Sequence, residues 1–213
     1  MKTIEIVDDK ILGKYFAYKT KTAKQPFKNQ MKSCHIVKLY PEDIVVDIGA
    51  YVGEYSMYAS TRAKKVYSYE ASPETFKVLQ SNKRGCMDIF NVAIVGGSEK
   101  IARLYLSKGV GATNSIVKSH NKAGFIDVPA INYIDAVKSA TIVKIDVEGA
   151  EYSYDIIQPN LRAIILEFHP IEGIDWKSRA TNIIDQLLFS GFKTLLLPQF
   201  RHGWDTNGAW VRS

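Results

Sequence analysis

The chain has 213 residues, of which 46% are hydrophobic and 23% are charged. This composition is ordinary for a globular protein and excludes a disordered, collagenous or low-complexity chain. No apolar run approaches the roughly 18 residues that a membrane-spanning helix needs, and residues 1–10 lack the apolar segment of a secretory signal. The two cysteines, Cys34 and Cys86, predict reduced thiols in the cytoplasm rather than a disulfide framework.

The net charge of +6 is concentrated at the N-terminus. Residues 1–40 contain nine Lys, no Arg and three acidic residues, whereas residues 41–213 contain equal numbers of basic and acidic residues. Tyr and Phe residues are interleaved with these lysines. We predict a basic segment of mostly helical or irregular structure, which serves either as a lid over the substrate or as a contact for nucleic-acid phosphates.

From residue 41 onward, short apolar runs alternate with helical patterns. Strands are predicted at 44–48, 66–70, 89–95, 141–146, 163–169, 192–197 and 209–212, and helices at 53–60, from Ser72-Pro73, from about Ala150 and around Ala180. Strands that are apolar on both faces favour a parallel sheet covered by helices. We therefore predict a single α/β domain over 41–213, with a three-layer Rossmann-like fold and a mostly parallel central sheet.

Residues 96–135 interrupt this alternation. Strand pieces are predicted at 101–106 and 125–131, and the polar stretch 109–115, which contains two glycines, lies between them. In open α/β sheets, ligands bind beyond the carboxyl ends of the strands, where loops carry the functional residues. We interpret 96–135 as an insertion that flanks such a site.

The first strand ends in a glycine turn, Asp47-Ile-Gly-Ala-Tyr-Val-Gly53. Gly49 and Gly53 allow a tight turn and a close approach of the backbone to a ligand. A helix follows and offers its free N–H groups. Glu70, at the end of the second strand, can accept hydrogen bonds from both hydroxyls of a ribose.

Three interpretations of this turn are open: a site for S-adenosylmethionine, a site for a dinucleotide, and a turn without a ligand. The spacing G-x-x-x-G differs from the G-x-G-x-x-G that is typical of dinucleotide sites. Asp47 favours S-adenosylmethionine, because an acidic turn attracts its ammonium and sulfonium groups and no phosphate has to be bound.

The chain resembles the FkbM-type family of S-adenosylmethionine-dependent methyltransferases, which have the class I fold. The resemblance rests on VVDIGAYVGEYS at 45–56, YSYEASP at 67–73, IVKIDVEGAE at 142–151 and IILEFH at 164–169. It implies a methionine-end site at Asp47, Gly49, Ala50, Tyr51 and Gly53, a ribose contact at Glu70, and an adenine frame of Ala71, Ser72, Val92 and Ala93. Family members often carry Asn at the position of Tyr51.

A second acidic block predicts the reaction centre. Asp146 and Glu148 follow one strand, and Glu167 and His169 end its neighbour, so we expect these side chains to converge at the carboxyl edge of the sheet. Asp146 is expected beside the methyl group and is thus also a candidate cofactor contact. Asp146, Glu148 or His169 can then be the general base for a hydroxyl acceptor. A divalent metal on Asp146, Glu167 and His169 is an alternative that we do not favour, because no compact motif such as H-x-x-x-H occurs. Structural roles are the other alternative, with a Lys144–Glu148 ion pair and a hydrogen-bonded His169.

The absence of two motifs limits the chemical class of the expected methyl acceptor. No Pro-Pro and no Pro-Cys pair occurs, which disfavours methylation of base amines and of cytosine C5. An oxygen acceptor is therefore expected, and the resemblance implies a hydroxyl of a sugar, a glycan or another small molecule. Ribose 2′-O-methylation of RNA is the alternative reaction, and a non-catalytic nucleic-acid-binding module is the alternative from another class. The sequence leaves the oligomeric state open.

Overall fold

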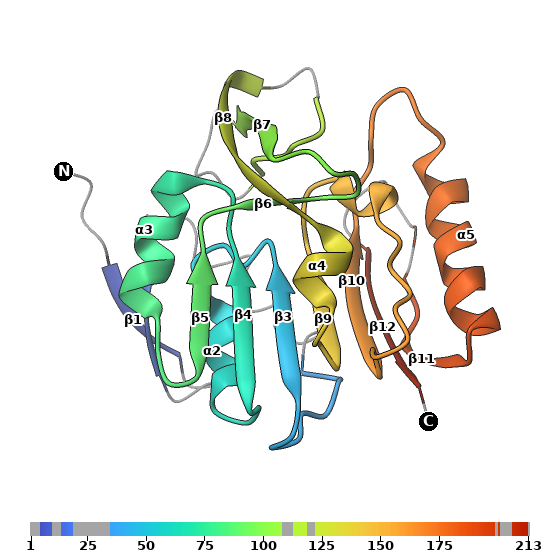
Figure 1. The fold of residues 1–213 in the computed structure, drawn as a ribbon, viewed down its shortest axis with the longest axis horizontal. Coiled ribbons are helices and arrows are strands. Elements are labelled where there is room, and N and C mark those ends of the chain that lie inside the picture. The colour runs from blue at the N-terminus through green and yellow to red at the C-terminus, as the bar shows by residue number, and fades with distance from the viewer. Residues whose placement is uncertain are drawn as a thin grey trace.

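The computed structural model describes residues 5–9, 14–18, 35–107, 113–118, 122–198, 200 and 206–212. A seven-stranded sheet with the order β11-β12-β10-β9-β3-β4-β5 forms its centre (Figure 1). These strands are β3 (Ile44–Ile48), β4 (Lys65–Tyr69), β5 (Met87–Phe90), β9 (Ile142–Ile145), β10 (Ala163–Phe168), β11 (Phe192–Leu196) and β12 (Thr206–Arg212). β12 is antiparallel to β10 and β11, whereas the other pairs are parallel. The predicted mostly parallel sheet is confirmed.

Helices cover both faces of this sheet. They are α2 (Glu54–Ser60), α3 (Pro73–Asn82), α4 (Tyr133–Val137) and α5 (Trp176–Phe189). α2 and α3 share a core with Val45, whereas α4 and α5 share a second core with Val46 and Val143. Successive residues of one strand thus enter opposite cores, which explains why the strands are apolar on both faces. Among the helices of the described segments, none has the length and apolar character that a membrane crossing requires.

The single strand predicted at 89–95 is wrong, because the chain leaves the central sheet after β5. The Asn91 side chain donates hydrogen bonds to the backbone oxygens of Glu70 (2.8 Å) and Ala71 (3.1 Å). The next strand, β6 (Ala93–Val95), belongs to a second sheet. Asn91 therefore ties the end of β4 to the point where the chain changes sheets.

The helix predicted from about Ala150 is also wrong. The chain forms a single 3₁₀ turn there, η2 (Ala150–Ser153). Two β-branched residues, Ile156 and Ile157, and then Pro159 follow, and these residues disfavour a continued helix.

The region predicted as an insertion contains a second sheet of the order β6-β8-β7. β7 (Ile101–Ser107) and β8 (Lys122–Asn132) pair antiparallel and arch over the carboxyl ends of the central strands (Figure 1). Both strand pieces predicted here are confirmed. Of the polar stretch 109–115, residues 109–112 lie outside the described residues.

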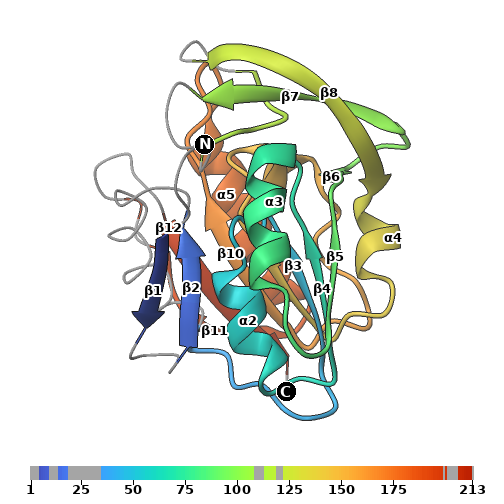
Figure 2. The same cartoon turned by 90° about the vertical axis from the view of Figure 1, so that its left-hand side faces the viewer.

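The described part of the basic N-terminal segment corrects the prediction of helical or irregular structure. β1 (Glu5–Asp9) and β2 (Lys14–Tyr18) form an antiparallel hairpin that lies beside α3 (Figure 2). β-branched and aromatic residues are enriched in both strands and favour this conformation. Residues 1–4, 10–13 and 19–34 lie outside the described residues, and the prediction for them stays a prediction.

A buried ion pair joins three strands at their amino ends. Asp43 is 1% exposed and accepts hydrogen bonds from Arg162 Nε (2.8 Å), Thr141 Oγ1 (2.8 Å) and the Tyr40 N–H (2.7 Å). Burial alone raises the pKa of Asp43, but these hydrogen bonds, that of Arg162 foremost, outweigh it and hold the pKa below its ordinary value. The carboxylate thus links the starts of β3, β9 and β10.

Asp43→Asn is expected to lower the free energy of unfolding at pH 7 by about 2–3 kcal/mol, because hydrogen bonds to a charged group are lost. The pKa of Asp43 is lower in the folded than in the unfolded state. Its stabilisation is therefore complete above the unfolded pKa of about 3.9 and is lost as the pH falls through the folded value.

Urea unfolding at pH 7 and at about pH 3 tests this prediction. The difference in the free energy of unfolding between the native protein and Asp43→Asn should be smaller at the lower pH. Asp185→Asn, on the exposed face of α5, is the control. A loss of the same size in the control, or a difference that does not change with pH, contradicts the role of Asp43.

Candidate active site

The glycine turn after β3 lies against the end of β9. Gly49 has a φ of +75°, and a Cβ atom there would lie 1.7 Å from the backbone oxygen of Asp146. Gly53, with a φ of +95°, caps α2, and its Cβ would lie 2.6 Å from Leu79 Cδ1. Side chains fit neither the space nor the backbone conformation at these positions. Both glycines are therefore needed to bring the turn onto the carboxyl edge of the sheet.

The backbone of Tyr51 orients Glu70. Tyr51 has a φ of +52°, a left-handed conformation that Asn adopts more readily than Tyr. Its N–H donates to Glu70 Oε2 (2.9 Å), and the Ser72 N–H donates to Glu70 Oε1 (2.8 Å). Burial raises the pKa of Glu70 to about 7, although these two hydrogen bonds act in the opposite direction. Glu70 is partly exposed at the end of β4.

Asp47 belongs to a buried charge network. It is 0% exposed; its Oδ2 accepts from the Ser56 hydroxyl (2.6 Å), and its Oδ1 lies 3.3 Å from Lys144 Nζ. Lys144 Nζ also lies 3.4 Å from Asp146 Oδ2 and donates a hydrogen bond to the backbone oxygen of Gly49 (3.4 Å). This ammonium joins the glycine turn to the end of β9. Asp47 is therefore enclosed by Ser56 and Lys144 and does not reach the surface of the site.

The residues expected around an adenine lie beside the ends of β4 and β5. Ala71 and Val92 are partly exposed, whereas Ser72 and Ala93 are buried. The Ser72 hydroxyl caps α3 by accepting from the Thr75 N–H (3.3 Å), which makes its side chain structural. On the other side of the glycine turn, Ala50 is buried in the core that α2 and α3 cover.

Glu54 is an acidic residue of this edge that the sequence analysis missed. It lies in the first turn of α2, directly after Gly53, and is partly exposed. Burial raises its pKa to about 8, and the charges of Asp47 and Asp146 act in the same direction. A positively charged ligand at this place would favour the ionised form. Its position within the quoted segment 45–56 was the available signal.

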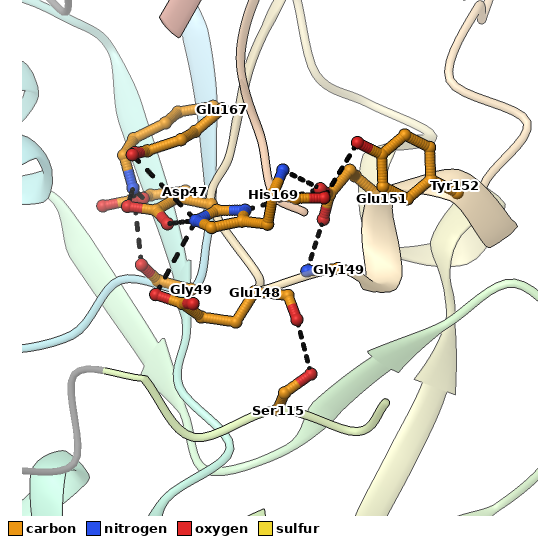
Figure 3. Close-up of polar contacts among 11 residues, drawn as sticks. Asp47, Gly49, Ser115, Glu148, Gly149, Glu151, Tyr152, Glu167 and His169 are labelled. Atoms are coloured by element: carbon orange, nitrogen blue, oxygen red, sulfur yellow. Dashed lines mark hydrogen bonds and ion pairs between the residues drawn. The ribbon is translucent and has the colours of Figure 1, made fainter. Parts of the chain in front are cut away.

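The structure brings together the four residues expected to converge at the reaction centre, of which Glu148, Glu167 and His169 are labelled in Figure 3. His169 Nε2 lies 3.7 Å from Asp146 Oδ1, 3.7 Å from Glu148 Oε1 and 4.0 Å from Glu167 Oε1. On the other side of the ring, Nδ1 lies 3.4 Å from Glu151 Oε1. Burial lowers the pKa of the imidazole, but Glu151 and the other carboxylates raise it by more, to well above its ordinary value. The surrounding carboxylates therefore favour the protonated form of the ring.

Glu151 holds the loops after β9 and β10 together. It is 0% exposed; its Oε2 accepts from the Gly149 N–H (2.8 Å), and its Oε1 accepts from the His169 N–H (2.7 Å) (Figure 3). The Tyr152 hydroxyl donates to the His169 oxygen (3.0 Å). Glu151 is thus a positioning residue that was not predicted as part of the site, although it ends the quoted segment 142–151.

Ser115 connects the inserted region to the same loop. Its hydroxyl donates to the backbone oxygen of Glu148 (2.7 Å) and accepts from the Val117 N–H (2.9 Å). Its backbone pairs with that of Tyr105 in β7. Glu148 has a φ of +56°, a conformation that surrounding contacts have to maintain in a residue other than glycine. The insertion therefore helps to fix the direction of the Glu148 side chain.

The strand order, the antiparallel β12 and the glycine turn define a class I, Rossmann-like methyltransferase fold. The family model described as the methyltransferase FkbM domain matches residues 47–194. The chain therefore belongs to the FkbM methyltransferase family. A search of curated proteins gave no match.

Solved structures share this fold at low sequence identity. They include the methyltransferase FkbM from Methylobacillus flagellatus KT, with 14% identity and a TM-score of 0.55 over 83% of this chain and 45% of that one. An rRNA methylase from Streptococcus thermophilus has 10% identity and a TM-score of 0.52 over 89% and 97% of the two chains. The tRNA m1G37 methyltransferase of M. jannaschii has 13% identity and a TM-score of 0.54 over 100% and 58%. The present chain thus spans less than half the length of the M. flagellatus protein.

Glu151→Gln is expected to destabilise the fold by about 1–3 kcal/mol, because the amide group cannot accept from both N–H donors and one of them stays buried and unpaired. It should also lower the pKa of His169, since the Glu151 charge raises that pKa in the native protein. Urea unfolding and an NMR titration of the His169 ring measure the two effects.

Glu172→Gln, an exposed substitution on the loop after β10, is the matched control. A His169 pKa that is the same in native protein and in Glu151→Gln would show that Glu151 does not hold the imidazolium.

Proposed function

We propose that this chain is an S-adenosylmethionine-dependent O-methyltransferase that acts on a hydroxyl group of a sugar, a glycan or another small molecule. The observation that carries the proposal is the position of the His169 cluster directly beside the glycine turn. Lys144 connects Asp47 and Gly49 of the turn to Asp146 of the cluster. A cofactor site and a set of proton acceptors thus share one edge of the sheet, and membership of the FkbM family supports this cofactor.

The residues of the turn fit S-adenosylmethionine. Glu70 offers a carboxylate to the ribose hydroxyls, and the partly exposed Ala71 and Val92 lie where an adenine would extend. Asp47 and Glu54 supply negative charge near the methionine end, which attracts the ammonium and the sulfonium. When bound, the cofactor supplies a methyl group on a sulfonium, and this group departs as a neutral thioether.

A carboxylate is the best proton acceptor in the cluster, because the neighbouring carboxylates raise the pKa of His169 and favour its protonated form. We assign the general base to Glu148, whose side chain is 26% exposed. It takes the proton of the acceptor hydroxyl while the hydroxyl oxygen bonds the methyl carbon and the carbon–sulfur bond breaks. Asp146 orients the hydroxyl, and His169 balances the charge of both carboxylates. A positioned base contributes about 10²–10⁴-fold to the rate.

Acceptor selectivity is assigned to the parts outside the central sheet. We propose one methyltransferase domain over 41–213, in which the insertion at 96–135 borders the acceptor and residues 1–40 act as a lid. The hydrogen bond from Ser115 to Glu148 supports the role of the insertion. The net charge of residues 1–40 supports an acceptor with anionic groups at its outer end.

RNA ribose 2′-O-methylation is the second candidate, and the basic segment favours it. The carboxylates around His169 disfavour a phosphate at the reaction centre itself. Filter binding of RNA at low and high salt separates the candidates. Negligible binding at low salt removes both this reaction and a non-catalytic nucleic-acid-binding module, whereas methyl transfer to RNA replaces the sugar proposal.

Glu70→Ala and Glu70→Gln are expected to weaken S-adenosylhomocysteine binding about tenfold or more, because hydrogen bonds to a charged group are lost. Since the pKa of Glu70 is raised to about 7, native affinity should fall as the pH decreases from 8 to 6. The affinity of Glu70→Gln should change less over the same range. Isothermal titration calorimetry measures both, with Asp185→Asn as control, and unchanged affinity of Glu70→Ala discards the ribose role.

Glu148→Gln, Asp146→Asn and His169→Ala should each retain S-adenosylhomocysteine binding within a few-fold. Methyl transfer should fall by about 10²–10⁴-fold in Glu148→Gln, since it lacks the base. Transfer of a labelled methyl group to a panel of sugars and glycans measures the activity. Full turnover in all three variants refutes the proposed reaction centre.

A further inference from the structure

Two carboxylates and one imidazole at the reaction centre form a set of metal-ligand groups. One ligand atom each from Asp146, Glu148 and His169 all lie within 4.8 Å of one another. The Nε2–oxygen distances of 3.7 Å exceed hydrogen-bond length. They come close to the separation of about 3.0–3.4 Å between neighbouring ligands of an ion bound at 2.1 Å. A small inward movement of these side chains would complete a coordination sphere.

The buried imidazole is aimed into this set. His169 is 5% exposed, and its Nε2 faces carboxylate oxygens of Asp146 and Glu148 at 3.7 Å, beyond hydrogen-bond length. Its buried Nδ1 has no hydrogen-bond partner among the described residues. Buried polar atoms normally have a hydrogen-bond partner. Behind the ring, Nδ1 faces the Glu151 carboxylate at 3.4 Å, and a carboxylate behind the ring is the usual support of a metal-bound histidine. The ring is therefore held with Nε2 toward the two carboxylates, and an ion bound there would take the place of the Nε2 proton.

Charge and sequence position agree with a cation at this place. The carboxylates of Asp47, Asp146, Glu148, Glu151 and Glu167 surround the ammonium of Lys144 and the imidazole of His169. Negative charge is thus in excess even when the ring is protonated, and a divalent ion would offset it. The ligands come from the ends of two neighbouring strands, which explains why no compact metal motif occurs in the sequence.

We propose that Asp146, Glu148 and His169 bind a divalent cation of the Mg²⁺ and Mn²⁺ class, with Glu167 as a nearby fourth carboxylate. Carboxylate and water ligands suit these ions, and one imidazole ligand is compatible with Mn²⁺. Lys144 lies 3.4 Å from Oδ2 of Asp146, whereas Oδ1 is the oxygen that faces His169. The assignment of a role rests on the proposed function: the ion would lower the pKa of the acceptor hydroxyl so that its proton passes to water. It would thereby replace Glu148 as the cause of deprotonation, because Glu148 would then be a ligand.

Calorimetric titration of the metal-free full-length chain with MnCl₂ tests the site, and electron paramagnetic resonance counts the Mn²⁺ that stays free. One saturable site is expected. Glu148→Gln and His169→Gln should each weaken binding about tenfold or more, since even partners behind a ligand contribute 10–100-fold. Asp185→Asn should leave it unchanged. Circular dichroism checks the fold, and the partial exposure of Glu148 makes Glu148→Gln the decisive variant if His169→Gln fails to fold.

The proposal is overturned if Mn²⁺ shows no saturable binding, or if binding is the same in Glu148→Gln as in the native protein. A parallel titration with S-adenosylhomocysteine in metal-free buffer separates this failure from a failure of the proposed function. Cofactor binding without Mn²⁺ binding refutes the metal site and leaves the methyltransferase proposal in place. Mn²⁺ binding without cofactor binding supports the site and refutes the proposed function.

Discussion

The buried carboxylate of Glu151 is the contact on which the geometry of the reaction centre depends. β9 and β10 are parallel, so their carboxyl ends lie side by side, but the loops that follow diverge. Glu151 accepts hydrogen bonds from the N–H groups of Gly149 and His169, one in each loop. It thereby holds Glu148 beside the imidazole. A carboxylate without exposure is costly unless hydrogen bonds and an opposite charge compensate it. The protonated form of the His169 ring supplies that charge, so the ring and the Glu151 carboxylate stabilise each other.

Much of the central sheet is predictable because its signals are local. Apolar runs on both strand faces, the glycine turn and the Ser72-Pro73 helix start reflect preferences of a few neighbouring residues. The exit of the chain after β5 was not predictable, because it depends on the Asn91 side chain bonding carbonyl groups about twenty residues earlier in the sequence. The hairpin of β1 and β2 escaped prediction because its strands are short and charged residues, Asp8, Asp9 and Lys14, adjoin their apolar residues.

The residues of the candidate site likewise fall into those that could be predicted from the sequence and those that could not. Asp146, Glu148 and His169 could be located because they follow the carboxyl ends of neighbouring parallel strands. Glu151 and Ser115 could not, because their hydrogen bonds join loops that lie apart in the sequence. The raised pKa of His169 likewise follows from contacts that only the folded chain creates. Sequence patterns thus indicated which groups meet at the edge of the sheet, whereas the groups that orient them required the structure.

The arm built by β7 and β8 stands on a small sheet of its own, and its strands do not take part in the hydrogen-bond ladder of the central sheet. Changes in its length or composition therefore need not alter the register of β3, β4 and β9, and Ser115 connects the arm to the backbone oxygen of Glu148. Such an arrangement behaves as an exchangeable module: under the proposed function, remodelling of the arm would change the acceptor while the glycine turn and the central sheet stay constant.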